Sequence, residues 1–341
     1  MSETNNAASS QHLVEVHDLK TYFHTAAGTA KAVDGVSFTL DRGKTLAIVG
    51  ESGSGKSVTA SSLMRLLPKT GKIEGGTVEF DGHDIVAAGE AELRQMRGKD
   101  ISMIFQDPMT ALDPVFKVGT QMIENIRIHD GLDKAAARER AVEMLRLVSI
   151  PNPEKRMDSY PYELSGGMCQ RVMIAMAMSC HPKFIIADEP TTALDVTVQA
   201  QVLSLLKSLQ DSMDTGILLI THNLGIVWQM ADDVMVMYAG RTCEYASMEE
   251  LYANPLHPYT WGLLDSMPKL SDKAKSDLKT IPGVPPDLRL TGACCNFYNR
   301  CPYACEKCKN EVPPLVEVKP GHFVACHMQN GEQTLVRGEA N

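Results

Sequence analysis

Short apolar runs and longer segments with helical spacing alternate along the first 250 or so residues of the chain. The runs LVEVHDL, VSFTL and TLAIVG, within residues 13–49, predict strands, and so do TVEF, ISMIF, FIIAD and GILLITH further along. Helices are predicted for GKSVTASSLMRLL, for two segments between residues 118 and 149, for SGGMCQRVMIAMAMSC and for VTVQAQVLSLLKSLQ. Strands that alternate with helices favour an α/β core.

The pattern changes at both ends of the chain. Beyond about residue 250, NPLHPY, MPKLSDKAKSD and IPGVPPDLRLTG concentrate proline and charge, which predicts a linker and an appended small domain. Residues 1–11 have neither a basic nor an apolar segment, so we expect a disordered tail rather than a signal peptide. The longest apolar runs, VMIAMAM and GILLI, fall well short of the roughly 18 residues of a spanning helix. Any membrane role is therefore expected to depend on partner proteins.

Length and charge narrow the class of protein further. A chain of 341 residues predicts two domains, one large and one small. Its 33 basic and 42 acidic residues give a net charge of -9, and no basic stripe is sustained. We therefore expect no nucleic acid among its partners.

The segment GESGSGKS matches the phosphate-binding pattern G-x-x-x-x-G-K-S and lies between a predicted strand and a predicted helix. Small residues let backbone amides close around a phosphate chain, and the start of a helix favours negative charge. Lys56 offers a point charge, and Ser57 offers an oxygen ligand for Mg²⁺. The predicted nucleotide contacts are Gly50, Ser52, Gly53, Ser54, Gly55, Lys56 and Ser57.

A pair of carboxylates, Asp188 and Glu189, ends the predicted strand FIIAD. A carboxylate at this end of a strand can hold the Mg²⁺ that bridges two phosphates, and a second can deprotonate an attacking water. Taken alone, the pair fits an exposed acidic turn equally well. Together with the phosphate loop, it favours nucleotide hydrolysis.

Four further features are LSGGM at residues 164–168, TTALD at 191–195, His222 and Gln106. They resemble, in this order, the signature, the D-loop, the switch histidine and the Q-loop glutamine of ATP-binding cassette (ABC) ATPases. This resemblance implies an α/β cassette over residues 12–250, with a RecA-like core, a helical subdomain at about 107–180 and an antiparallel β subdomain. The small Cys-rich extension would then cover residues 251–341.

The resemblance also implies a role for each motif. Two cassettes would stack head to tail, and each ATP would lie between the phosphate loop of one chain and the signature of the other. The catalytic residues would be Glu189 as general base, His222 at the γ-phosphate and Gln106 sensing Mg²⁺ or water. Ser57, Gln106 and Asp188 would hold Mg²⁺, and Ser165, Gly166, Gly167 and Asp195 would serve the neighbour's nucleotide.

Some positions leave alternatives open. Phe23 occupies the place of the family's adenine-stacking aromatic residue, although a buried aromatic residue is the plainer interpretation. Met168, Cys169 and Asn223 depart from the commonest family pattern. None of the three departures removes a group that ATP hydrolysis requires.

The segments VMYAGR, NPLHPYTWGLL and IPGVPP resemble the D-type ATPases of dipeptide and oligopeptide importers. The resemblance implies an ATP hydrolase that powers peptide uptake from the cytoplasmic face of the inner membrane. Its partners would be two transmembrane permease subunits, a second and different cassette ATPase, and an extracytoplasmic peptide-binding protein.

Nickel and antimicrobial-peptide importers share this type of cassette. A soluble cassette ATPase acting on DNA or ribosomes is disfavoured by the single uninterrupted cassette and the acidic balance, and an iron–sulfur electron carrier would leave the phosphate loop unused.

The stretch GACCNFYNRCPYACEKC places five cysteines close together near the end of the chain. Cys294, Cys301, Cys308 and Cys326 have the spacing C-x6-C-x6-C-x17-C, which resembles the [4Fe-4S] pattern of dipeptide-importer ATPases. Zinc is the main alternative, free thiols are another, and a shift by one position would bring in Cys295 or Cys305. The other three cysteines, Cys169, Cys180 and Cys243, are expected in the core.

Overall fold

The computed structural model describes residues 12–191, 194–266, 280–329 and 334–337. The chain forms two compact units, each built from several stretches of sequence. Unit 1 consists of residues 1–13, 40–45 and 81–220, and unit 2 of residues 14–39, 46–80 and 221–341. The predicted tail at residues 1–11 and the segment MPKLSDKAKSD lie outside the described residues.

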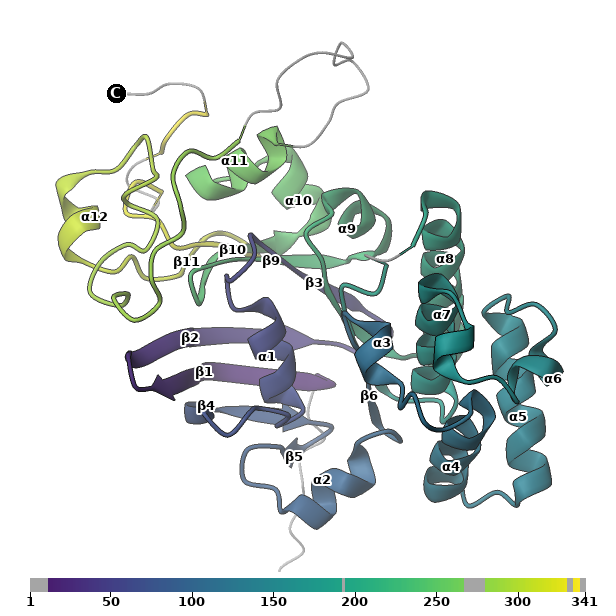
Figure 1. The fold of residues 1–341 in the computed structure, drawn as a ribbon. Helices are drawn as coiled ribbons and strands as arrows, with labels where there is room; N and C mark the ends of the chain where they lie inside the picture. The colour runs from purple at the N-terminus through teal and green to yellow at the C-terminus, as the bar shows by residue number, and fades with distance from the viewer. Residues whose placement is uncertain (1–11, 192–193, 267–279, 330–333, 338–341) are drawn as a thin grey trace, which may run out of the picture. The chain divides into compact units, whose positions relative to one another are not determined.

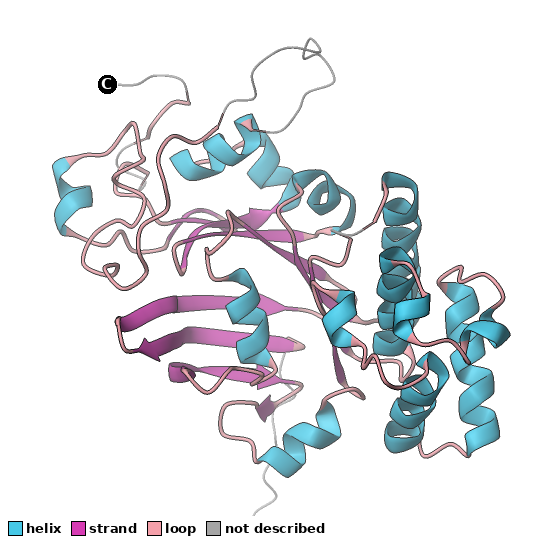
Figure 2. Ribbon diagram, viewed as in Figure 1, coloured by secondary structure: helices cyan, strands magenta, loops and turns pink. Residues whose placement is uncertain are grey.

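Unit 1 contains three parallel strands, β6 (Ile101–Ile104), β7 (Phe184–Asp188) and β8 (Gly216–Ile220). β7 and β8 are buried at every residue, which explains why their sequences are unbroken apolar runs. The helices α4 (Val118–Asp130), α5 (Lys134–Leu147) and α7 (Gly166–Met178) pack on one another (Figures 1 and 2). Together with α8 (Val196–Met213), these elements confirm the helices and strands predicted for this region.

Several short elements of unit 1 were not predicted from the sequence. They are β5 (His83–Asp84), α2 (Glu90–Met96), α3 (Pro108–Ala111), α6 (Pro153–Arg156) and the 3-10 helix η1 (Pro161–Glu163). All have seven residues or fewer, so the apolar periodicity within each is too brief to identify it.

Unit 2 holds two groups of paired strands. In the first, β1 (Val14–Thr25) lies between β2 (Gly28–Leu40) and β4 (Gly71–Phe80), and it pairs with β4 in antiparallel orientation. These strands are longer than the apolar runs that predicted them. Helix α1 (Lys56–Leu63) contacts β1.

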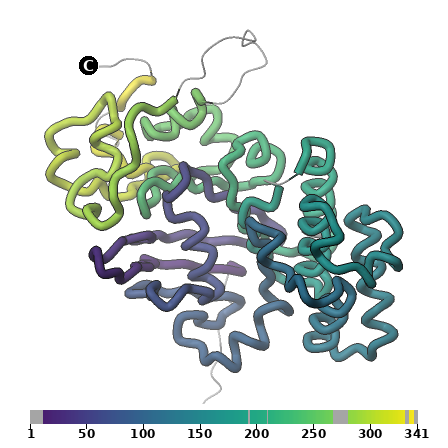
Figure 3. Tube along the Cα trace, viewed as in Figure 1, coloured from purple at the N-terminus to yellow at the C-terminus, as the bar shows by residue number. Residues whose placement is uncertain are grey.

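In the second group the strand order is β11-β12-β10-β9-β3. β3 (Thr45–Val49) runs parallel to β9 (Asp233–Tyr238), which pairs with β10 (Arg241–Ser247). The last two strands, β11 (Val316–Lys319) and β12 (His322–Val324), complete the order through an antiparallel pairing of β12 with β10. The yellow end of the chain in Figure 3 therefore joins the strands that include β3, which leads into the phosphate loop.

The linker expected after residue 250 is short at NPLHPY, because residues 254–257 connect two helices and Pro258 and Tyr259 already belong to the second. After α9 (Leu224–Met230), helices α10 (Met248–Ala253) and α11 (Pro258–Asp265) follow, and α12 (Glu306–Asn310) lies among the cysteines. Pro258 stands at the first turn of α11, where a proline costs no hydrogen bond, and His257 caps that helix. Tyr259 and Trp261 are buried, so α11 is a packed helix.

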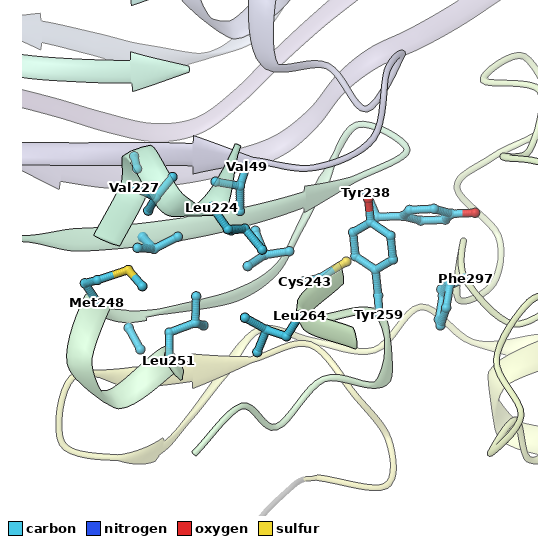
Figure 4. Packing of buried hydrophobic residues seen from close by; sticks show 14 of the residues in the cluster. Val49, Leu224, Val227, Tyr238, Cys243, Met248, Leu251, Tyr259, Leu264 and Phe297 are labelled. Carbon is cyan, nitrogen blue, oxygen red and sulfur yellow. The ribbon is translucent and has the colours of Figure 1, made fainter. Parts of the chain in front are cut away.

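One apolar cluster joins these elements of unit 2. Val49 of β3, Tyr238 of β9, Tyr259 of α11 and Phe297 of the extension are all buried in it (Figure 4). The rings of Tyr238, Tyr259 and Phe297 lie 4.7–5.3 Å apart, centroid to centroid. The Cys-rich region therefore shares a core with the strand that precedes the phosphate loop.

In the part of the chain that the structure describes, the helices are all too short or too polar to cross a bilayer.

Candidate nucleotide site

The phosphate loop connects β3 to α1, and two of its glycines have backbones that a larger residue could not adopt. Gly50 has φ 153° and Gly55 has φ 105°. A Cβ atom on Gly50 would lie 2.2 Å from the carbonyl oxygen of Met237, and one on Gly55 would lie 2.3 Å from that of Ala32. Gly55, at the N-cap position of α1, carries no side chain that could cap this helix start. The start of the helix is therefore suited to an anion such as a phosphate.

Lys56 folds back over the loop. Its buried ammonium donates hydrogen bonds to the carbonyl oxygens of Gly50 (2.8 Å) and Glu51 (2.9 Å). Ser57, the predicted Mg²⁺ ligand, is exposed beside it. Ser52 and Gly53 are exposed and Ser54 is buried, so the loop presents one face to solvent.

Glu51, inside the phosphate loop, is held by residues of the C-terminal region. Its backbone N–H donates to the hydroxyl of Tyr259 at 2.7 Å. Its carboxylate accepts two hydrogen bonds from the guanidinium of Arg300, at 2.5 and 3.0 Å. This hydrogen bond raises the pKa of Arg300 above its already high ordinary value. Glu51, Tyr259 and Arg300 were not predicted as site residues, because residues so distant in sequence give no local signal of their contact.

The predicted adenine platform lies in β1. Phe23 is half-buried, and its ring packs over Gly71, its partner on β4. The neighbouring Tyr22 donates a hydrogen bond to Asp34, and burial together with this bond raises the pKa of Tyr22 to about 12. Adenine stacking by Phe23 stays a prediction.

The carboxylate pair of unit 1 stands at the C-terminal end of β7. Asp188 is buried, and Glu189 turns out of the strand in a left-handed conformation with φ 48°. Such a conformation is strained for a glutamate, and strain of this kind is often found at functional sites. Gln106, which follows β6, donates a hydrogen bond of 3.0 Å to the carboxylate of Glu189. Two predicted catalytic residues are thus brought together.

His222 belongs to unit 2 and is exposed just after β8. The next residue, Asn223, is one of the departures from the family pattern. Its side chain caps α9 by accepting a hydrogen bond from the N–H of Gly225 at 2.9 Å. An asparagine therefore has a structural role at this position.

The signature segment opens α7 at the surface of unit 1. Ser165 caps the helix by accepting from the N–H of Met168, and both Ser165 and Gly166 are exposed. Gly167 is partly exposed, with Leu194 beside it. Asp195 caps α8 in the same way, by accepting from two backbone N–H groups. The helix start that was predicted to face a neighbour's phosphates is therefore accessible.

The predicted metal ligands of the extension do not form a preassembled site. Among the described residues, including Cys294, Cys301, Cys308 and Cys326, no three or more side chains are arranged to hold a metal ion. The Sγ atoms of Cys305 and Cys308 lie 3.5 Å apart. The neighbouring thiols that raise the pKa of Cys326, beyond the larger effect of burial, are those of Cys301, Cys295 and Cys308. Cys295, the alternative by a shift of one position, thus lies near this group.

Burial keeps most of these thiols protonated. It raises the pKa of Cys295, Cys301 and Cys308 to about 11, and that of Cys326 to about 12. Cys169, Cys180 and Cys243 are buried, as expected for core residues. Metal binding would have to release the protons of the extension thiols, because the thiolate is the ligand.

Comparison with known families agrees with this geometry. The ABC transporter family model matches residues 33–192, and the model of the C-terminal region of oligopeptide and dipeptide transporters matches residues 243–308. The fold also resembles a dimeric ATP-binding cassette solved in a post-hydrolysis state with ADP and Pi. That likeness has a TM-score of 0.63 and 25% identity, and it covers 69% of this chain and 98% of the other. The molecule is thus an ABC-type ATPase.

Relatives with similar sequences show which kind of ABC ATPase this chain is. The oligopeptide transport ATP-binding protein OppD of Bacillus subtilis is 51% identical over 92% of this chain and 87% of its own length. OppD of Salmonella typhimurium is 52% identical over 92% of this chain and 93% of its own. The chain belongs to the ABC transporter family, in the branch of the oligopeptide transport ATP-binding proteins. The predicted fold class and ATPase activity are confirmed, and the alternative of a soluble ATPase acting on DNA or ribosomes is not supported.

Proposed function

We propose that this protein hydrolyses ATP to power the uptake of di- and oligopeptides through partner transmembrane subunits. The observation that carries the proposal is identity of about half to oligopeptide transport ATP-binding proteins, over both the cassette and the C-terminal region. Both parts matter, because a cassette alone would be compatible with many cargoes.

Each predicted site residue has a proposed role in this reaction. Backbone amides of the phosphate loop and Lys56 bind the phosphates, and Phe23 contacts adenine. Ser57, Gln106 and Asp188 hold Mg²⁺, which neutralises phosphate charge. Glu189 takes a proton from the attacking water, and its hydrogen bond from Gln106 supports a shared position beside that water. His222 contacts the γ-phosphate.

The signature would act on a second ATP. We propose that Ser165, Gly166, Gly167 and Asp195 face the nucleotide bound by another cassette subunit. The exposed start of α7 supports this role, since exposed helix N-termini bind anions. The second subunit is expected to be a different chain.

The membrane partners would dock near Gln106. Four large apolar side chains are exposed within twelve residues of sequence that include it, namely Phe105, Met109, Val115 and Phe116. Exposed apolar side chains grouped in this way are typical of interaction surfaces. Two permease subunits would cover them, holding the chain at the cytoplasmic face of the membrane, and an extracytoplasmic binding protein would deliver the peptide.

The extension thiols are a second part of the proposal. We propose that they bind a metal centre, a [4Fe-4S] cluster or, as the alternative, Zn²⁺. Two contacts support the thiols as ligands: the Sγ atoms of Cys305 and Cys308 lie 3.5 Å apart, and the backbone N–H of Cys295 donates to the carbonyl oxygen of Cys308 at 2.9 Å. Because no such group is preassembled among the described residues, the ligands would close around the metal as it binds.

Reconstituted transport tests the main proposal. The complex that copurifies with the tagged chain from its native membranes is placed in vesicles, and uptake of labelled tripeptide, labelled pentapeptide and Ni²⁺ is measured with and without ATP. ATP-dependent uptake of peptide that is lost in Lys56→Ala supports it. Uptake of Ni²⁺ alone, or copurification without membrane subunits, would contradict it.

A further inference from the structure

Arg300 uses all of its hydrogen-bond donors, which bind the phosphate loop, the end of β9 and the extension itself. Besides the two bonds to Glu51, the guanidinium donates to the carbonyl oxygens of Ile281 and Pro282 and to the hydroxyl of Tyr238. A guanidinium has five N–H groups, so none is left over. The Arg300 side chain is only 4% exposed, whereas that of Glu51 is 29% exposed. The arginine is therefore fixed from the extension side and presents a rigid fork to the loop.

Every polar group of Glu51 has a partner in this arrangement. Its carboxylate binds Arg300, its N–H binds the Tyr259 hydroxyl, and its carbonyl oxygen accepts from Lys56. Tyr259 is fully buried, and its ring packs on those of Tyr238 and Phe297. Three separate contacts thus determine the position of one loop residue, and two of them come from the chain beyond residue 250.

Because Glu51 is negatively charged, its contacts with Arg300 and Lys56 are expected to affect the binding of ATP. Glu51 is a carboxylate in a loop that is built to receive phosphates, and its carbonyl oxygen shares the ammonium of Lys56 with that of Gly50. An unpaired carboxylate there would repel a triphosphate and draw Lys56 toward itself. Arg300 neutralises the carboxylate through a partly buried bidentate ion pair, and it keeps the carboxylate turned toward the extension.

We propose that Arg300 and Tyr259 are positioning residues of the nucleotide site, through which the C-terminal extension holds the phosphate loop in its ATP-binding form. Residues of the extension thereby contribute to ATP binding. This inference rests on the proposed role of residues 50–57 in phosphate binding.

Substitutions of a charged side chain by neutral glutamine separate this role from a general effect on the stability of the fold. Arg300→Gln retains a donor but leaves the charge of Glu51 uncompensated. Glu51→Gln retains an acceptor but removes that charge. The matched control is Arg289→Gln, because Arg289 forms an exposed ion pair with Asp287 in the same extension. For each full-length variant, affinities for ATP, ADP and AMP are measured by displacement of a fluorescent ATP analogue at low and high salt, after thermal unfolding has verified folding.

We expect Arg300→Gln to weaken ATP binding about tenfold, to weaken AMP binding much less, and to recover in part at high salt, since the repulsion acts on phosphate charge. Glu51→Gln should bind ATP as well as the wild type or better. The double variant should match Glu51→Gln, and Arg289→Gln should match the wild type. Tyr259→Phe should weaken ATP binding with little dependence on salt, because it removes a neutral hydrogen bond.

Three results would overturn the inference. The first is ATP binding by Arg300→Gln equal to that of the wild type. The second is equal weakening of ATP and AMP binding at all salt concentrations. The third is an effect of Arg300→Gln that persists unchanged beside Glu51→Gln. If Arg300→Gln does not fold, weaker ATP binding by the folded Glu51→Gln variant would overturn it too. Failure of the wild-type protein to bind ATP would instead refute the proposed function, so the two failures are distinguishable.

Discussion

The side-chain amide of Gln106 donates a 3.0 Å hydrogen bond to the carboxylate of Glu189. One residue follows β6 and the other follows β7, two paired parallel strands of the same unit. The C-terminal edge of a parallel sheet is where ligands bind in α/β proteins, so this contact joins two predicted catalytic groups at the expected edge.

Replacing Glu189 with Gln should nearly abolish ATP turnover while preserving ATP binding. The glutamine keeps the size of the side chain and an oxygen that can accept from Gln106, but it is a poor proton acceptor. Loss of a general base costs about 100-fold to 10,000-fold in rate. ATP hydrolysis by the purified complex checks this, with Gln106→Ala as a companion variant. Turnover close to that of the wild type would rule out Glu189 as the base.

Two glycines of the phosphate loop should differ in their tolerance of alanine. Gly53→Ala adds a Cβ atom in open space and should cost only about 1–2 kcal/mol for its left-handed backbone, which has φ 76°. Gly55→Ala should cost more and should abolish tight ATP binding, because its Cβ would lie 2.3 Å from a carbonyl oxygen. Chemical denaturation and ATP titration measure the two effects. Equal behaviour of the two variants would argue against the loop conformation described above.

The buried histidine His322 should make stability fall as the pH rises above neutral. Burial lowers its pKa, but hydrogen bonds to Glu244 and Glu250 outweigh burial and raise the pKa above its usual value. The folded state then binds the proton more tightly, so this contribution is complete below the pKa of the unfolded chain, about 6.5, and is lost as the pH rises through the folded pKa. Glu250 also forms an ion pair with Lys319, whose positive charge therefore lies on the same carboxylate that His322 contacts.

His257 acts in the opposite direction. Burial lowers its pKa to about 4, so it is neutral when folded, and stability should fall as the pH drops from about 6.5 toward that value. Denaturation curves between pH 5 and pH 9 should therefore show a maximum near neutrality. In His322→Gln the decline on the alkaline side should flatten, and an unchanged alkaline slope would contradict the assignment.

The adjacent cysteines Cys294 and Cys295 offer a matched pair for the proposed metal centre. The backbone N–H of Cys295 donates a hydrogen bond to the carbonyl oxygen of Cys308, another predicted ligand, whereas the spacing of the sequence favours Cys294. We expect anaerobically purified protein to contain iron and sulfide in equal amounts, Cys295→Ser to lose both, and Cys294→Ser to retain them. Elemental and sulfide analysis of each variant shows which metal is bound and which of the two cysteines is needed to hold it. Stoichiometric zinc would favour the alternative metal, and loss of metal in Cys294→Ser alone would restore the spacing prediction.

Local patterns predicted the parts of the site that are made of contiguous residues. The phosphate loop has a fixed spacing because its amides must surround one phosphate chain, and Ser165 and Asp195 cap helices whose periodicity is clear. The left-handed turn at Glu189 carries no such local signature, since glycine rather than glutamate is the usual residue there.

Contacts between distant segments could not be predicted in the same way. Glu51 and Arg300 are 249 residues apart, and nothing in either local sequence indicates the other. The prolines after residue 250 suggested a linker, yet Pro258 begins a helix whose Tyr259 is buried against β9 and the extension. A proline at the first turn of a helix and a proline in a linker look alike until the packing is known.

The proposed sharing of each ATP between two cassettes is tested most directly by two measurements. One is ATP affinity in the isolated chain, and the other is ATP turnover in the whole complex. Lys56→Ala should lose both, because the role proposed for Lys56 is at the ATP bound in the loop of its own chain. Ser165→Arg should retain wild-type affinity in the isolated chain and lose turnover in the complex, because the role proposed for Ser165 is at the ATP of the neighbouring cassette. An isolated Ser165→Arg chain that binds ATP as poorly as Lys56→Ala, or a Ser165→Arg complex with full turnover, would contradict the shared site.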